Sequence, residues 1–239
     1  MSVLKERQKT ILSATIREYV RTARPIASQE LSRHLKEDIS SATIRNEMLA
    51  LDELGLLEQP HTSAGRVPTD KGYRFFVDNL PVDGFLQERD EETLREIFSI
   101  RDAEDFIREF SKTVSAISRT FTAAGMFEED IFYETGFSRI MEEPEFYDPD
   151  NGRMFGRLLD ILGEKLRDIA QDTLEKEERI FIGRENPLKE AAECSMIFSP
   201  WRHPEGFSGF ITLIGPKRTN YPRHKALVRS IKKIQGQSD

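Results

Sequence analysis

The chain has 239 residues and a net charge of −7, with 38% hydrophobic and 32% charged residues. That is enough apolar material for a packed core, which excludes a fully disordered protein. No apolar run reaches the ~18 residues of a membrane span, and the charged N-terminus is unlike a signal peptide. The single Cys194 excludes an internal disulfide framework, and with only four histidines a zinc site has little material. We expect a soluble, cytoplasmic protein without a cofactor.

The negative charge is unevenly distributed along the chain. Residues 1–80 contain 12 Lys or Arg and 11 Asp or Glu, a net charge of +1, so residues 81–239 carry the remaining −8. Net charge neither requires nor forbids DNA binding, because what matters is whether one face is locally basic. The acidic second part is expected either to repel DNA, leaving binding to the first part, or to serve solubility.

The first 80 residues begin with three predicted helices. Apolar residues at three- and four-residue spacing predict a helix over residues 4–22, which Arg24-Pro25 ends. Ser28 is expected to cap a short second helix. A third helix is expected from Ser41 to about residue 54, where Gly55 stops it.

A predicted hairpin follows the three helices. Leu56–Gln59 and Val67–Thr69 are expected to pair as strands around a polar tip, and Asp70–Leu80 to form another short helix. Helix, turn, helix and hairpin is the order of a winged helix-turn-helix domain. We therefore expect residues 1–80 to be a winged-helix DNA-binding domain.

Pro81-Val82-Asp83-Gly84 marks the expected end of that domain. Residues 81–125 are predicted to be a linker with helices, broken at Gly125. One of them carries an apolar seam with 4-3-4 spacing, which is typical of a dimerisation helix. The alternative is ordinary packing onto the following domain. The seam consists of Phe110, Val114, Ile117 and Phe121.

Residues 126–239 alternate between strand and helix patterns. An amphipathic helix is predicted over residues 155–169 and a final helix over Pro222–Ile234. Three strands are predicted, at Arg179–Gly183, Ser195–Ser199 and Phe207–Ile214. The expected fold class is α+β: a winged helix, a connecting dimerisation helix and a small C-terminal α/β domain.

The third helix carries the residues that suit DNA recognition. With Ile44, Met48 and Leu51 facing inward, Arg45 and Asn46 face outward, where arginine can pair with guanine and asparagine with adenine. The N-terminal turn offers backbone N–H groups to a phosphate. Any solvent-facing helix carries polar residues, so this face alone is not decisive. The outward set comprises Ser41, Ala42, Thr43, Arg45, Asn46 and Leu49, of which the first five are DNA-binding candidates.

The hairpin tip, residues 61–66, contains no acidic residue. A flexible tip ending in Arg66 suits a minor groove or flanking phosphates. For His61 a hydrogen bond within its own loop is the simpler role. The remaining candidates of this region are Ser63, Gly65, Lys71 and Arg74.

Long stretches of the chain resemble the heat-inducible transcription repressor family HrcA. The most distinctive is PHTSAGRVPTDKGYR, within the similar residues 41–76. ERQKTIL, ARPIASQELSRHL and the C-terminal Ile182-Gly183 and Ile214-Gly215-Pro216 also match, and GFSRIMEEPEF resembles the family's dimerising insertion. The resemblance implies a homodimeric repressor that binds an inverted-repeat operator, CIRCE, ahead of chaperone genes. It also implies a GAF-like domain, and support of its activity by the chaperonin GroEL.

The chain departs from the family pattern in its middle. The helix expected to end near Phe121 runs almost directly into the insertion-like segment Ile131–Phe146, so a block of the family's middle is expected to be missing. We therefore expect a shortened member with a reduced GAF-like domain.

Other functions are weighed against the repressor. An enzyme would need more than the acidic pairs Glu142-Glu143 and Glu175–Glu178, which have no accompanying histidine, and Cys194 is expected to be a core residue. A small-molecule sensor could use Trp201, Arg202 and His203, although a lid on the core is the simpler role. The last alternative is a winged helix that binds protein or RNA. In that case the sequence of the hairpin tip would be free to differ from that of the family, so its close match counts against this alternative.

Overall fold

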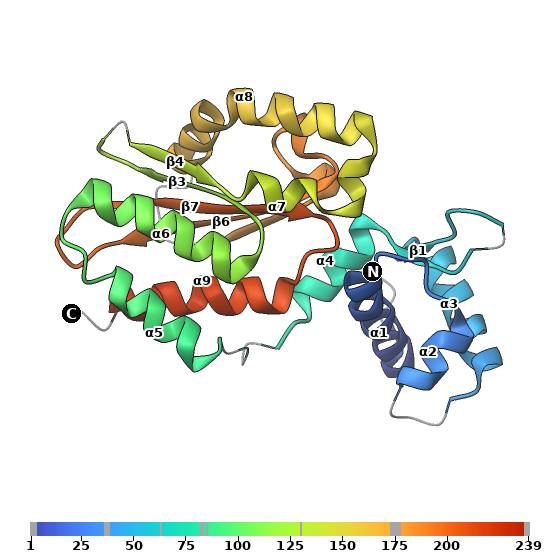
Figure 1. Ribbon diagram of the computed structural model, residues 1–239. Helices are drawn as coiled ribbons and strands as arrows, with labels where there is room; N and C mark the ends of the chain where they lie inside the picture. Colours follow the sequence, from blue (N-terminus) through green and yellow to red (C-terminus); the bar gives the residue numbers. More distant parts are fainter. Residues whose placement is uncertain are drawn as a thin grey trace. The chain divides into compact units, whose positions relative to one another are not determined.

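The computed structural model describes residues 4–35, 39–62, 64–81, 84, 86–129, 131–172 and 178–236. The chain divides into two compact units, Met1–Leu80 (unit 1) and Pro81–Asp239 (unit 2), which can be followed by colour in Figure 1. Each unit buries hydrophobic residues of its own.

Unit 1 contains four helices, in the predicted order, among its described residues. The third helix ends where expected, since Gly55 takes a φ of 70° and the N–H of Leu56 reaches back to the carbonyl of Leu51 at 2.9 Å. The prediction that Ser28 caps the second helix was wrong: Ala27, with extended backbone angles, is the capping position and Ser28 is the first helical residue. The helices are α1 (Glu6–Thr22), α2 (Ser28–His34), α3 (Ser41–Glu53) and α4 (Asp70–Asp78).

A short antiparallel hairpin completes unit 1. Its strands β1 (Leu57–Glu58) and β2 (Val67–Pro68) pair with Leu57 opposite Pro68. Ile26, between α1 and α2, adds to the hairpin: its N–H and carbonyl both bond to the backbone of Arg66, at 2.9 Å each. The hairpin, which we call the wing (residues 57–68), is thereby joined to the helices, and the predicted winged helix-turn-helix is confirmed.

Unit 2 is built around a five-stranded antiparallel sheet, and its strand order is β4-β3-β7-β6-β5. The central strand β7 and its neighbour β6 are the longest, and they pair along their full length from Cys194 opposite Pro216 to Arg202 opposite Ser208. The strands are β3 (Phe121–Met126), β4 (Phe132–Thr135), β5 (Arg179–Ile182), β6 (Cys194–Arg202) and β7 (Ser208–Pro216).

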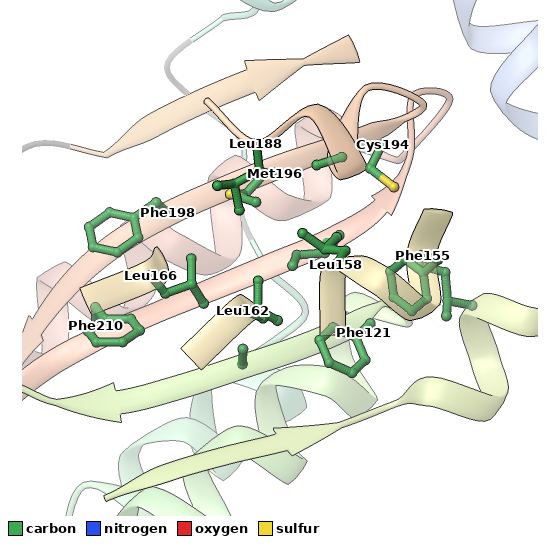
Figure 2. Packing of buried hydrophobic residues seen from close by; sticks show 14 of the residues in the cluster. Phe121, Phe155, Leu158, Leu162, Leu166, Leu188, Cys194, Met196, Phe198 and Phe210 are labelled. Atoms are coloured by element: carbon green, nitrogen blue, oxygen red, sulfur yellow. The ribbon is translucent and has the colours of Figure 1, made fainter. Parts of the chain in front are cut away.

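Helices cover both faces of this sheet (Figure 1). On one face lies α8 (Pro149–Asp172), whose Leu158, Leu162 and Leu166 point at the sheet in Figure 2. These leucines pack with sheet residues such as Phe198 and Phe210. On the other face lie three helices: α5 (Glu88–Ile97), α6 (Ala103–Ser118) and α9 (Tyr221–Gly236). The predicted α+β class is confirmed.

The structure corrects the predicted dimerisation helix. The helix α6 ends at Ser118, and Phe121 begins strand β3, where Gly125 pairs opposite Phe210 instead of breaking a helix. The reason is that an apolar stripe looks alike whether it faces a second chain or the chain's own sheet. The four seam residues are buried inside unit 2 and leave no surface for a partner: Phe110, Val114, Ile117 and Phe121.

The expected three-part division is corrected as well. Residues 81–125 are not a linker, because α5, α6 and β3 are integral parts of unit 2. Between α6 and the insertion-like segment Ile131–Phe146 the chain forms β3, and the segment itself begins with β4, so the sheet keeps its first hairpin. The rest of the segment consists of α7 (Phe137–Met141) and a 3₁₀ turn, η1 (Pro144–Tyr147). It is anchored by Arg218, which pairs with both Glu143 and Glu145.

Two of the three residues considered for a small-molecule sensor, Trp201 and His203, belong to the core, whereas Arg202 is exposed. Trp201 and Arg202 lie on β6 and not in a loop, and Trp201 is buried beside Phe106 at a ring-centroid distance of 5.1 Å. His203 is also buried and stacks on Phe207 at 4.2 Å. Burial lowers the pKa of His203. These rings pack together over the core at one end of the sheet, which agrees with the simpler role, a lid on the core.

Candidate nucleic-acid interface

The N-terminus of α3 is fixed by Ser40. Its hydroxyl accepts a hydrogen bond from the backbone N–H of Thr43 at 3.2 Å and lies 2.9 Å from the Thr43 hydroxyl. Thr43 is therefore engaged in the cap, whereas Ser41 and Ala42 stand exposed on the first turn. This turn has small side chains, and so a second molecule can come close to its backbone.

The two sides of α3 differ sharply in chemistry. Ile44, Met48 and Leu51 are buried, as predicted, while Arg45 and Asn46 are exposed. The carboxylate of Glu47 faces inward, where it accepts a hydrogen bond from Nε of Arg7 on α1 at 2.7 Å. The exposed side of the helix is therefore free of this negative charge. We call that side the reading face: Ser41, Ala42, Arg45, Asn46 and Leu49.

Two residues hold the wing in place. The amide nitrogen of Gln59 donates to the carbonyls of Thr62 and Ala64, at 3.0 and 2.9 Å, and so closes the tip. Gly65 lies against the segment before α2, and a Cβ at this position would come within 2.3 Å of the backbone of Ile26. Glycine is therefore needed at this position so that the wing can pack against Ile26. This packing role is separate from the DNA contact that the sequence predicts for Gly65.

Arg66 turns back toward α3. Its Nε lies 2.8 Å from Oδ2 of Asp52 in the last turn of the helix, and its side chain is only 16% exposed. Together with the backbone bridge to Ile26, this ion pair ties the base of the wing to the segment before α2 and to α3. The geometry favours a positioning role for Arg66 over the direct phosphate contact expected from the sequence.

Lys71 and Arg74 are similarly engaged within unit 1. Nζ of Lys71 donates to the carbonyl of Leu54 at 2.8 Å, next to the bond from the Thr69 hydroxyl to the carbonyl of Gly55 at 2.7 Å. Both bonds satisfy the C-terminal end of α3. Arg74 pairs with Asp78 one turn along α4 at 3.3 Å.

A hollow of about 420 Å³ separates the reading face from the wing. Among the described residues, its lining includes two arginines and no carboxylate. Small residues of α2 and the wing leave it wide. The lining residues are Ile26, Ala27, Ser28, Arg45, Asn46, Met48, Leu49, Gln59, Thr62, Ala64, Gly65 and Arg66.

The structure thus brings together part of the predicted set. Arg45, Asn46, Gly65 and Arg66 border one hollow, with Ser41 and Ala42 at the exposed start of α3. His61 is exposed at the wing tip, where its carbonyl accepts from the N–H of Ala64 at 2.8 Å. Ser63 lies outside the described residues. The remaining predicted residues are engaged in contacts within unit 1 and do not line the hollow: Thr43, Lys71 and Arg74.

Sequence reasoning missed the residues that support this surface. Three of them hold the surface through pairs that no local sequence pattern marks. Glu47 and Asp52 pair with arginines far away in the sequence, and Gln59 bonds to backbone carbonyls of the wing turn. Thr69 is different, because it caps α4 by accepting from the N–H of Gly72 at 3.1 Å. A threonine three residues before the bonded N–H is a recognisable helix start, so this role was available from the sequence.

No second kind of site emerges from the described part of the chain. No three His, Cys, Asp or Glu among those residues are grouped as a metal site, and none of their helices is long and apolar enough to cross a membrane. Burial raises the pKa of the Cys194 thiol to about 12, which keeps it protonated and unreactive. Glu143 is paired with Arg218, and residues 175–177 of the second acidic run lie outside the described residues.

Comparison with known proteins agrees with this geometry. Residues 3–79 match a family described as "Winged helix-turn-helix transcription repressor, HrcA DNA-binding", and residues 81–224 match "HrcA protein C terminal domain". A crystal structure of a hypothetical protein has the same fold, with a TM-score of 0.70 at 18% identity, covering 99% of this chain and 98% of that one.

Three relatives named "Heat-inducible transcription repressor HrcA" show how the chain aligns. The Syntrophobacter fumaroxidans protein is 27% identical over 329 positions, covering 93% of this chain and 94% of the relative. That alignment is longer than the chain, so part of the relative has no counterpart here. Those from Acetivibrio thermocellus (48% over 116 residues) and Brevibacillus brevis (50% over 99) match 48% and 41% of this chain. These two matches span only 31% and 29% of the relatives.

The two family matches together cover most of the chain, and they name a transcription repressor and not an enzyme. The chain is also shorter than the Syntrophobacter fumaroxidans relative, 94% of which it aligns with. The chain therefore belongs to the HrcA family of heat-inducible transcription repressors, as a shortened member.

Proposed function

We propose that the protein represses transcription by binding, as a homodimer, to an inverted-repeat operator of the CIRCE type ahead of chaperone genes. In this proposal α3 lies in the major groove, with Arg45 and Asn46 on base edges and the N-terminal turn at Ser41 and Ala42 near a phosphate. The wing tip at His61 reaches the flanking backbone or minor groove. The protein acts in the cytoplasm.

The observation that carries this proposal is the charge pattern of α3. Its reading face exposes a guanidinium and an amide, while two carboxylates of α3 are paired, Glu47 with Arg7 and Asp52 with Arg66. The third carboxylate of the helix, Glu53, is exposed in its last turn, two turns beyond Arg45. An acidic chain thus presents a surface that a polyanion can approach.

Arg45→Ala is expected to weaken operator binding by about 1–3 kcal/mol and to relax the sequence preference at one base pair, because a bidentate contact to guanine is lost. Binding is measured on the operator and on duplexes with each base pair replaced in turn. Arg157→Ala, an exposed arginine of α8, is the matched control and should leave binding unchanged. An Arg45→Ala variant with wild-type affinity and preference would remove the assigned role.

Arg66→Ala tests the positioning role of the ion pair. The expected loss of operator affinity is about 0.5–1 kcal/mol, the range of a partly exposed pair, with the salt dependence of binding unchanged. A direct phosphate contact would instead lower the salt slope by about one. Exchanging the two charges, Asp52→Arg with Arg66→Asp, should restore part of the affinity. If the charge exchange restores no affinity and the salt dependence of binding is flatter than in the wild type, Arg66 contacts a DNA phosphate directly.

A dimer would place two copies of α3 on one side of the duplex, about 34–36 Å apart or at a multiple of that spacing. The two halves of an inverted-repeat operator would match this two-fold arrangement. The chaperonin GroEL is proposed as a further partner on the resemblance to the family alone.

A further inference from the structure

Leu49 is the one exposed large hydrophobic residue of unit 1 among the described residues, and 49% of its surface is accessible. A single exposed leucine needs no explanation by itself. Its position does, because it lies on the reading face one turn beyond Arg45 and Asn46, which the proposed function assigns to base edges. Residues 42, 45, 46 and 49 share one side of α3 by helical spacing.

The surroundings of Leu49 are suited to DNA and not to an apolar partner. Leu49 borders the hollow beside the wing, where its apolar neighbours Ile26 and Met48 are themselves buried. The other described lining residues are the small Ala27, Ala64 and Gly65 together with polar or cationic side chains, and no carboxylate is among them. The apolar area is therefore small and is framed by groups that match bases and phosphates.

Among base edges in the major groove, only thymine presents an apolar group, its 5-methyl. We propose that Leu49 is a specificity-determining residue that packs on the methyl group of one thymine in each half-site. This inference rests on the proposed function and deepens it, since it names a base that the site selects. The hollow gives that base and its backbone room between α3 and the wing.

The test replaces each thymine of a CIRCE-type duplex by deoxyuridine, which removes only the methyl group. We expect the wild-type protein to lose about fourfold in affinity per half-site at one thymine, the effect of exposing one buried methyl-sized group. Leu49→Ala should bind the thymine and deoxyuridine duplexes equally. Leu49→Met keeps an apolar side chain of similar volume and should retain the sensitivity. Tyr147→Ala, an exposed residue of unit 2, is the control and should behave as wild type.

The possible results distinguish the role of Leu49 from the proposed repressor function. Operator binding that is specific but indifferent to every methyl group, or equally sensitive in Leu49→Ala, overturns the role of Leu49 and leaves the repressor proposal standing. Equal binding of the wild type to operator and scrambled duplexes overturns both.

Discussion

Phe110→Ala is expected to lower the free energy of unfolding of unit 2 by about 3–5 kcal/mol, the cost of removing a fully buried phenylalanine. The side chain is completely buried in α6. Its ring lies 5.1 Å from Phe106, 5.5 Å from Phe98 and 5.8 Å from Trp201, measured between centroids. Truncation would leave a cavity that these large rings cannot easily fill.

Trp201 is the only tryptophan of the chain and lies in unit 2, so its emission during urea unfolding reports on this unit alone. Tyr147→Ala, with 70% of its surface exposed, is the control and should change stability little. Light scattering should give the same mass for Phe110→Ala and wild type wherever both are folded. A halved mass at unchanged stability would instead place Phe110 in a dimer interface.

The second large effect concerns acid. His224 in α9 is completely buried, and its Nε2 lies 3.0 Å from the carbonyl of Ser118 while Nδ1 lies 3.2 Å from the hydroxyl of Thr219. The neutral ring can donate to the carbonyl and accept from the hydroxyl. Desolvation lowers the pKa of His224 from 6.5 to about 4, an effect that the nearby Arg223 reinforces.

Between these two values the unfolded chain binds a proton at His224 that the folded chain does not. The free energy of unfolding therefore falls as the pH drops below 6.5, and the loss is complete below about 4. Its size is on the order of 3 kcal/mol. At pH 7 both states are neutral at this residue, and so nothing is lost.

His224→Gln removes the titration but keeps an amide donor for the carbonyl of Ser118. We expect the variant to be somewhat less stable than wild type at pH 7 and to have a flatter stability profile between pH 7 and 4. His203, whose pKa is also lowered by burial, is present in both proteins, and its contribution cancels in the difference. Parallel profiles of the two proteins would show that His224 does not carry the acid sensitivity.

Unit 1 could be predicted closely because its signals are local. Gly55 ends α3, Pro25 follows the end of α1, and the polar tip separates two short strands. What the sequence could not show is the direction of Arg66. A cation near a wing tip suits a phosphate, but its partner Asp52 lies on another element, and only the folded chain brings the two together.

Unit 2 was harder for a different physical reason. Strand β3 is buried along its whole length, so it has no alternation of polar and apolar residues to mark it as a strand. The apolar stripe of α6 was correctly found, but a stripe does not say which surface covers it. The amphipathic α8 was predictable because its helical period is long and uninterrupted. Strand β7 was predictable because it is an apolar run that Gly215-Pro216 closes.

The central claim is sequence-specific DNA binding by unit 1. It is tested most directly by a salt titration of binding to a CIRCE-type inverted repeat, measured beside a scrambled duplex of the same composition. We predict binding to the operator that is tighter by about 4 kcal/mol or more, with an affinity that falls steeply as salt is raised. Equal and weak binding to both duplexes would contradict the claim.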